Sequence, residues 1–223
     1  MGQYYRGVIL GKTTKKTKRV IIKQAYCCYA HKNGAKLMEH SYVSNWYVKA
    51  YEQALGGKFY GYPFVWVGDY ADEMFDTDVY TKAHEFIDDV TRRNAKAKGF
   101  YLVKTGWGCT HFEKHYKDGD IEKVEEDYFT EKVITEENAN KVDTFKYIIN
   151  FDKKEAVAMP EFKEDEWTIH PLPLLCASGN GRGGGDYSGI NEKMVGAWAY
   201  DRIGLDNELP DGIKLIEIEF KEN

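Results

Sequence analysis

The sequence lacks any apolar run that approaches the roughly 20 residues a membrane-spanning helix needs. Its first residues, MGQYYRGVIL, lack the charged segment, long apolar core and cleavage site of a secretory signal peptide. They also lack a Ser or Thr at position six of the myristoylation pattern, where Arg6 stands. We therefore expect a cytoplasmic protein with no membrane partner.

Excess positive charge is also missing. The chain has 31 Lys and Arg against 36 Asp and Glu, so its formal net charge is −5. A general nucleic-acid binder usually needs a basic face, and this balance argues against that class. One basic run, KTTKKTKR at residues 12–19, fits a solvated turn between two strands better than a phosphate-binding patch.

Cysteine is scarce, and its positions give no pairing pattern. The four cysteines are Cys27, Cys28, Cys109 and Cys176, and in a cytoplasmic protein we expect reduced thiols. The strings CCYAH and CTHFEKH combine cysteine with histidine, both zinc-ligand types, but neither contains a C-x-x-C pair. We therefore predict no metal and no cofactor.

Local periodicity predicts the secondary structure. Apolar residues spaced by three and four predict two helices, over residues 41–57 with Ser41 as N-cap and over residues 78–94. β-Branched and aromatic runs predict strands at residues 3–10, 18–26, 62–68, 99–105, 145–159 (a hairpin around the turn DKK) and 213–220. Since strands dominate and helices intervene, we predict an α+β fold with a largely antiparallel sheet and two or three helices.

The domain organisation follows from one polar stretch. We predict a single α+β domain over residues 1–223, with a polar excursion or insertion at about residues 106–143. The charged end of that stretch has weak apolar spacing, which fits an exposed helix or a mobile excursion. A faint echo between LGGKFYGYPFVWVGDYADE and VGAWAYDRIGLDNE leaves two related lobes as an open alternative.

The glycine-rich string SGNGRGGGDYSG is the main candidate for a ligand site. Glycine lets backbone N–H groups approach an anion closely, and an arginine among them can form paired hydrogen bonds to phosphate. The spacing is not that of a P-loop, and no helix is expected after it as in a dinucleotide fingerprint. A flexible loop beside the core is the alternative. The predicted ligand-binding residues are Gly181, Arg182, Gly183, Gly184, Gly185, Asp186, and Tyr187 or Trp198 as a stacking platform for a base.

Candidate catalytic residues lie elsewhere. His40 in KLMEHS and His170 before Pro171 are of the general-base type, and Asp69 directly follows a predicted strand. The alternative for His40 is a place beside a helix cap at Ser41. Asp69 also opens an acidic loop, residues 69–78, whose carboxylates suit a hard cation. Its spacing is not that of an EF-hand, so a solvated loop fits it better.

Several strings carry a resemblance to known proteins. MGQYYRGVIL, NGAKLMEHSYVSN, GDYADE and HPLPLLCASGNGRGGGDYSG resemble a group of phage and bacterial proteins that begin MGQYY and carry a KLMEHS segment. The string YIINFDKKE resembles the strand-turn YIVNLDKKEY of shorter bacterial relatives. The resemblance covers most of the chain outside residues 106–143. It implies a phage or bacterial setting and brings no catalytic residues.

Three functional hypotheses follow. The first is a non-enzymatic module that binds a small anionic or nucleotide-like ligand, which in a phage setting acts on a host signal. The second is a hydrolase or transferase that uses His40 or His170 with Asp69. The third is a protein-interaction or inhibitor protein whose acidic segment, residues 106–143, contacts a host protein.

Overall fold

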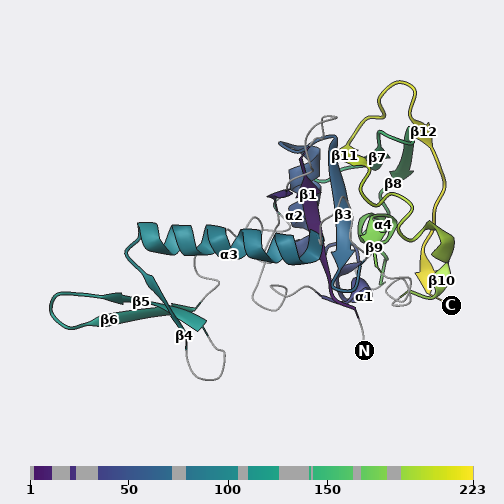
Figure 1. Ribbon diagram of the computed structural model, residues 1–223. Helices are drawn as coiled ribbons and strands as arrows, with labels where there is room; N and C mark the ends of the chain where they lie inside the picture. Colours follow the sequence, from purple (N-terminus) through teal and green to yellow (C-terminus); the bar gives the residue numbers. More distant parts are fainter. Residues whose placement is uncertain are drawn as a thin grey trace, which may run out of the picture.

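Most strands of the protein join one mixed, largely antiparallel sheet, which confirms the predicted α+β fold (Figure 1). Among the described residues, eight strands belong to it, in the order β12-β8-β7-β11-β3-β1-β2 with β9 beside β3. None of the helices in the described ranges has both the length and the hydropathy to cross a bilayer. The structure is a computed structural model that describes residues 3–11, 21–23, 35–71, 79–104, 110–125, 141, 143–162, 167–179 and 187–222.

The centre of the sheet is built from the most apolar predicted strands. β1 (Tyr5–Leu10) and β3 (Tyr62–Gly68) pair antiparallel along their length and are buried almost throughout. Apart from Arg6 in β1, both strands are largely apolar, because helices cover both faces of the sheet. β2 (Ile21–Lys23) forms the predicted hairpin with β1.

The other half of the sheet comes from the second half of the chain. The hairpin predicted over residues 145–159 is confirmed as β7 (Tyr147–Asn150) and β8 (Glu155–Ala158). β11 (Arg202–Asp206) joins this hairpin to β3. The two similar strings in the sequence, which suggested two related lobes as an alternative, contain β3 and β11. These two strands are neighbours in one sheet.

On the side away from β1, β3 pairs with two different strands. β11 pairs antiparallel with the start of β3, whereas β9 (Ala177–Ser178) pairs parallel with Trp66 and Val67. Tyr200 lies at the change of partner, with a left-handed φ of 68°, and its N–H donates to Phe64 O at 2.8 Å. As a result, β3 and β9 end side by side and point the same way.

One face of the sheet, which we call the α2 face, carries Phe64 and Trp66. α2 (Trp46–Gly56) packs there together with α4 (Pro171–Leu175). The predicted helix over 41–57 is confirmed for Trp46–Gly56, but it begins five residues later than predicted and its predicted N-cap is wrong. Asn45 caps α2 through its side chain, while the Ser41 hydroxyl donates to Leu37 O in α1 (Leu37–His40).

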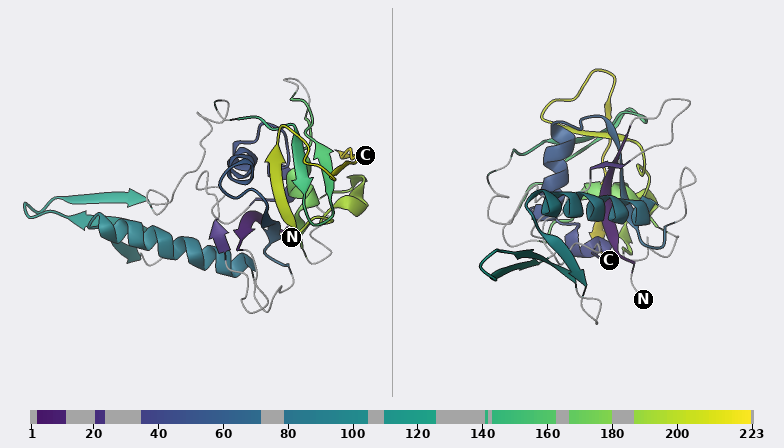
Figure 2. Two further views of the ribbon diagram at one scale, coloured as in Figure 1. Left: turned by 90° about the horizontal axis from the view of Figure 1, so that it is seen from above. Right: turned by 60° about the vertical axis from the view of Figure 1, so that its left-hand side comes forward.

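The opposite face, which we call the α3 face, carries Val65 and Val67. The first turns of α3 (Val79–Ala97) pack against it. At its far end, α3 reaches a separate small core formed by Ala95, Phe100 and Phe112. Figures 1 and 2 show α3 projecting from the main sheet, with a small separate sheet at its far end. We call the far end of α3 together with this small sheet the arm.

A three-stranded antiparallel sheet completes this arm. It contains β4 (Tyr101–Lys104), which confirms the predicted strand, β5 (Thr110–His115) and β6 (Ile121–Glu125). The charged stretch was expected to be an exposed helix or a mobile excursion, and the helix alternative is wrong for Ile121–Glu125, which is a strand. Residues 105–109, 126–140 and 142 lie outside the described ranges, so a contact surface within 106–143 stays a prediction.

The C-terminal segment departs from its predicted strand. β12 (Lys214–Leu215) pairs parallel with β8 for two residues only, and β13 (Lys221–Glu222) pairs with β10 (Gly189–Ile190), just before the short 3-10 helix η5 (Glu192–Met194). The chain between β12 and β13 is extended without a ladder. Its predicted alternation is confirmed, because Ile216, Ile218 and Phe220 are more buried than the glutamates between them.

Candidate functional site

The two predicted catalytic histidines lie on chain segments that meet. His170 N donates to Ser41 O at 3.0 Å, and Val43 N donates to Thr168 O at 2.8 Å. Both His40 and His170 are completely buried. The structure therefore brings these histidines into one region, below the surface rather than in an open pocket.

His170 has both ring nitrogens engaged. Its Nδ1 accepts from Leu172 N at 3.1 Å, which caps α4, so its Nε2 holds the proton and donates to Glu52 Oε1 at 2.9 Å. Lys49 Nζ contacts the other oxygen of Glu52 at 3.0 Å. Burial raises the pKa of the Glu52 carboxyl, but the hydrogen bond from His170 and the nearby positive charge of Lys49 lower it below its ordinary value. The geometry is that of a buried, hydrogen-bonded structural support.

His40 is enclosed by aromatic rings. Trp66 Nε1 donates to its Nε2, and the rings of Tyr47 and Trp66 lie 5.6 Å and 5.0 Å from its own. Asp69 is engaged elsewhere, because its Oδ1 accepts from Tyr4 N at 3.0 Å where β1 and β3 meet. The described geometry therefore gives the hydrolase or transferase hypothesis no support.

Asp69 lies instead near the start of the glycine-rich segment. In the parallel pairing of β9 with β3, Ser178 is opposite Val67, two residues before Asp69. Gly179 follows Ser178 directly and begins the glycine-rich string. Gly181, Arg182, Gly183, Gly184, Gly185 and Asp186, which were predicted to bind the ligand, lie outside the described residues.

Three polar side chains that the sequence interpretation missed surround this point. Arg6 is opposite Val67 in β1, almost completely buried, and its guanidinium lies 3.7 Å from the centre of the Tyr80 ring. On the same face, Ser178 Oγ and Tyr200 Oη lie 3.2 Å apart. We call Arg6, Asp69, Ser178 and Tyr200 the β3–β9 edge. An arginine within an otherwise apolar strand was the one sequence signal for it.

Tyr187 and Trp198, the predicted stacking residues, belong to the main core. Trp198 has no exposed surface and packs with Leu174 and Leu175. The Tyr187 hydroxyl bonds to the carbonyl oxygens of Ile190 and Lys221, so this ring joins the C-terminal segment to the core. Neither ring presents a face on which a base could stack.

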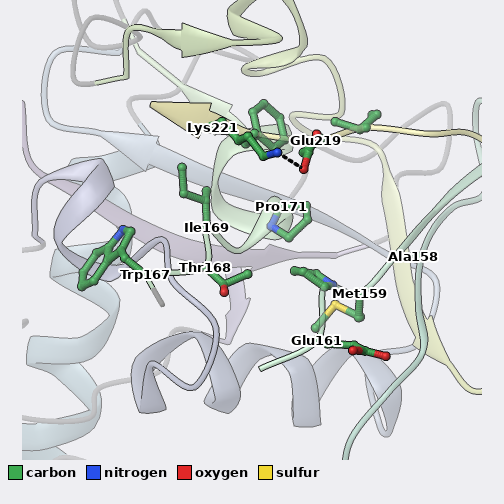
Figure 3. Close-up of a pocket in the computed structure, with 12 residues that line it drawn as sticks. Ala158, Met159, Glu161, Trp167, Thr168, Ile169, Pro171, Glu219 and Lys221 are labelled. Atoms are coloured by element: carbon green, nitrogen blue, oxygen red, sulfur yellow. Dashed lines mark ion pairs between the residues drawn. The ribbon is translucent and has the colours of Figure 1, made fainter. Parts of the chain in front are cut away.

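A groove opens on another part of the surface. Its volume is about 470 Å³, and its walls come from residues 158–161, 167–169, 171 and 218–221. Figure 3 shows Trp167 and Ile169 on one side, Ala158 and Met159 on the other, and the ion pair of Glu219 with Lys221 at one end. A second hollow of about 340 Å³ shares Ala158, Ile218 and Glu219 with it and continues along β8.

The groove combines an apolar lining with acidic groups. Trp167 is 60% exposed although its ring lies 4.4 Å from that of Tyr42. Glu161, Glu217 and Glu219 are exposed along the two hollows. Lys221, the single lysine among the described lining residues, pairs with Glu219 at 2.6 Å. The sequence interpretation missed this site, although a tryptophan beside the acidic string PEFKEDE was a signal for it.

Comparison of the chain with protein-family models, with curated proteins and with solved structures finds no match. Within the described ranges, no group of three or more His, Cys, Asp or Glu residues is placed to hold a metal ion. Cys176 is a free, buried thiol, and burial, with a smaller effect of Asp201, raises its pKa well above its ordinary value. Cys27, Cys28 and Cys109 lie outside the described residues.

Proposed function

We propose that the protein is a binding module for a small anionic, nucleotide-like ligand held at the β3–β9 edge. The observation that carries the proposal is the parallel pairing of β9 with β3. In open α/β sheets, ligands commonly bind beyond the carboxyl ends of parallel strands, and we apply this rule to the parallel pair of β3 and β9. Here the chain leaves that ladder into a glycine-rich string.

The neighbouring side chains suit an anion. Arg6 places a buried positive charge opposite Val67 on one side of β3, and Ser178 is opposite Val67 on the other side. The hydroxyls of Ser178 and Tyr200 are neutral polar groups on the same face. The Asp69 carboxylate accepts the Tyr4 N–H, which compensates part of its negative charge. Arg182, four residues after Ser178, is then the residue that we expect to form paired hydrogen bonds to phosphate.

A thermal-shift screen tests this function. Inorganic phosphate, nucleosides, nucleoside phosphates and cyclic nucleotides are each added to the full chain. A ligand present at a hundred times its Kd stabilises the folded state by about 2.7 kcal/mol. For a domain of this size, each kcal/mol raises Tm by roughly 2–4 °C. We expect phosphate-bearing compounds to raise Tm and the matching nucleosides to leave it unchanged.

Two variants decide where the ligand binds. Arg182→Ala removes the predicted phosphate contact and should abolish the shift. Arg92→Ala, on the exposed surface of α3, removes the same charge and should keep it. No stabilisation by any compound, or the same shift in Arg182→Ala as in the unmodified protein, would contradict the proposal.

A further inference from the structure

An open strand edge borders the groove. Lys154 O and Ala156 O accept from Lys214 N and Ile216 N, at 2.9 Å and 2.8 Å, so these residues of the β8 side face β12. Because hydrogen-bonding directions alternate along a strand, the N–H and C=O of Ala158 point the same way as those of Ala156. The C-terminal chain pairs with β8 no further than Ile216, and Ala158 faces the groove instead.

A second anchor keeps the C-terminal chain away from this edge. β13 pairs with β10, with Ile190 opposite Lys221. Asn191 Nδ2 donates to Glu219 O at 2.6 Å, and the ring of Phe220 lies 5.5 Å from that of Tyr187. The groove therefore has fixed backbone on both sides, and its volume is within the range of sites that bind ligands.

The lining of the groove restricts what fits. Its apolar surface comes from Ile169, Pro171 and Ile218, beside the exposed ring of Trp167 (Figure 3). The acidic groups outnumber the one lysine, whose charge is already compensated by Glu219. Nucleic acid, an anionic membrane surface, or the same groove of a second copy would each bring negative charge against these glutamates.

We infer that this groove binds an extended peptide that carries Lys or Arg side chains and pairs as a strand with the edge of β8 at Ala158. Strand addition satisfies the backbone groups of such an edge and places alternate side chains in pockets. The apolar side chains of the peptide pack on Ile169, Pro171 and Ile218, with Trp167 as the aromatic anchor. Its basic side chains pair with Glu161, Glu217 and Glu219.

Synthetic peptides test the inference directly. Three short labelled peptides of equal length are compared by fluorescence anisotropy with the full chain: alternating Lys and Val, alternating Glu and Val, and the Lys–Val peptide with alternate N-methyl groups. We expect the Lys–Val peptide to bind and to change the Trp167 emission. N-methylation removes ladder hydrogen bonds and should weaken binding about tenfold, which corresponds to about 1.4 kcal/mol.

Variants of the groove complete the test. The double variant Glu161→Gln and Glu219→Gln, and separately Trp167→Ala, should weaken binding of the Lys–Val peptide. Glu208→Gln changes an exposed glutamate that does not line the groove and should bind like the unmodified protein. Arg182→Ala, the variant of the proposed anion site, should also bind normally, because no residue of the β3–β9 edge lines the groove.

Four results would each overturn the inference. They are equal affinity for the Lys–Val and Glu–Val peptides, preference for the Glu–Val peptide, no binding of any peptide, and undiminished binding of the N-methylated peptide. The first would show apolar adhesion without charge selection, and the last would exclude strand addition.

Discussion

Buried polar side chains tie the irregular segments of this protein to its sheet. Glu52, His170 and Asn45 are all buried, and each makes hydrogen bonds that hold a helix end or a crossing segment in place. Burying such groups is costly unless their hydrogen bonds are made, so each pairing also fixes which segments meet. The histidines that suggested catalysis in the sequence have this supporting role in the structure.

Replacement of His170 tests that role. His170→Ala removes the cap of α4 and leaves Glu52 buried without its donor. We expect the free energy of unfolding to fall by about 3 kcal/mol, because the buried Glu52 carboxylate loses a hydrogen-bond donor and keeps only Lys49. Denaturant unfolding measures the change. His115→Ala, on the exposed hairpin, should alter it by no more than about 0.5 kcal/mol.

The pH dependence of that difference has a defined direction. The pKa of Glu52 is lower in the folded protein than its ordinary value. Its stabilising contribution is therefore complete above the unfolded-state pKa and disappears as the pH falls through the folded-state pKa. The difference in the free energy of unfolding between the unmodified protein and His170→Ala should therefore become smaller as the pH falls through that acidic range. A gap that widens on acidification would show that the Glu52–His170 pair is not its source.

At the scale of elements, sequence patterns predicted those features that depend only on residues close together in the chain. The burial of β3 and the turn between β7 and β8 follow from apolar runs and turn residues that lie within a few positions of each other. The residues 213–220 alternate as a strand should, yet only Lys214–Leu215 form a ladder with β8. A strand's partner is chosen by distant segments, so its own alternation does not identify the partner.

The two candidate sites could be predicted only in part for the same reason. Asp69 and the glycine-rich string were each recognisable, but their proximity depends on the parallel pairing of Ser178 with Val67, more than one hundred residues apart. The groove joins three stretches that are far apart in the sequence, and no local pattern shows that they meet. Trp167 indicates a binding groove only when the structure shows that its side chain is exposed.

The arm contains an element whose electrostatics can be measured directly. On β5, Glu113 accepts from His111 at 2.8 Å and from His115 at 3.1 Å, and Lys123 of β6 lies 3.1 Å from it. These contacts, with His111 the strongest, then Lys123 and His115, lower the pKa of the Glu113 carboxyl to about 2. The support that Glu113 gives to the hairpin is thus complete above its unfolded-state pKa and is lost only as the pH falls toward about 2.

Carbon-13 NMR titration of the Glu113 carboxyl tests this cluster. We expect His111→Gln to raise its pKa more than His115→Gln does, because His111 has the shorter and stronger hydrogen bond. The carboxyl of Glu122, which accepts from Tyr116 instead, serves as the internal reference. An unchanged Glu113 pKa in both variants would show that the histidines do not hold it.

At the scale of the whole molecule, two hydrophobic cores are joined by one helix. The first turns of α3 pack on the main sheet through Val79 and Ala83, while Ala95 belongs to the small core of the arm with Phe100 and Phe112. A helix of 19 residues extends about 28 Å at 1.5 Å per residue, which explains how the arm stands away from the body (Figure 1). Cores separated in this way tend to open as separate cooperative units.

Native-state hydrogen exchange can separate these units. Phe112 is the β5 side chain that is buried in the small core of the arm. Phe112→Ala should therefore make the amides of β5 exchange faster, while those of β3 keep their rates. Phe64→Ala leaves a cavity in the main core and should lower the global free energy of unfolding by about 3–5 kcal/mol, which accelerates exchange in β3 and β7. If Phe112→Ala accelerated exchange in β3 and β5 equally, the arm and the body would be one cooperative unit.

If only β5 responds, the effects of ligands on the arm and on the body can be distinguished by hydrogen exchange. A nucleotide at the β3–β9 edge or a peptide in the groove should then protect amides of the body and leave β5 unchanged.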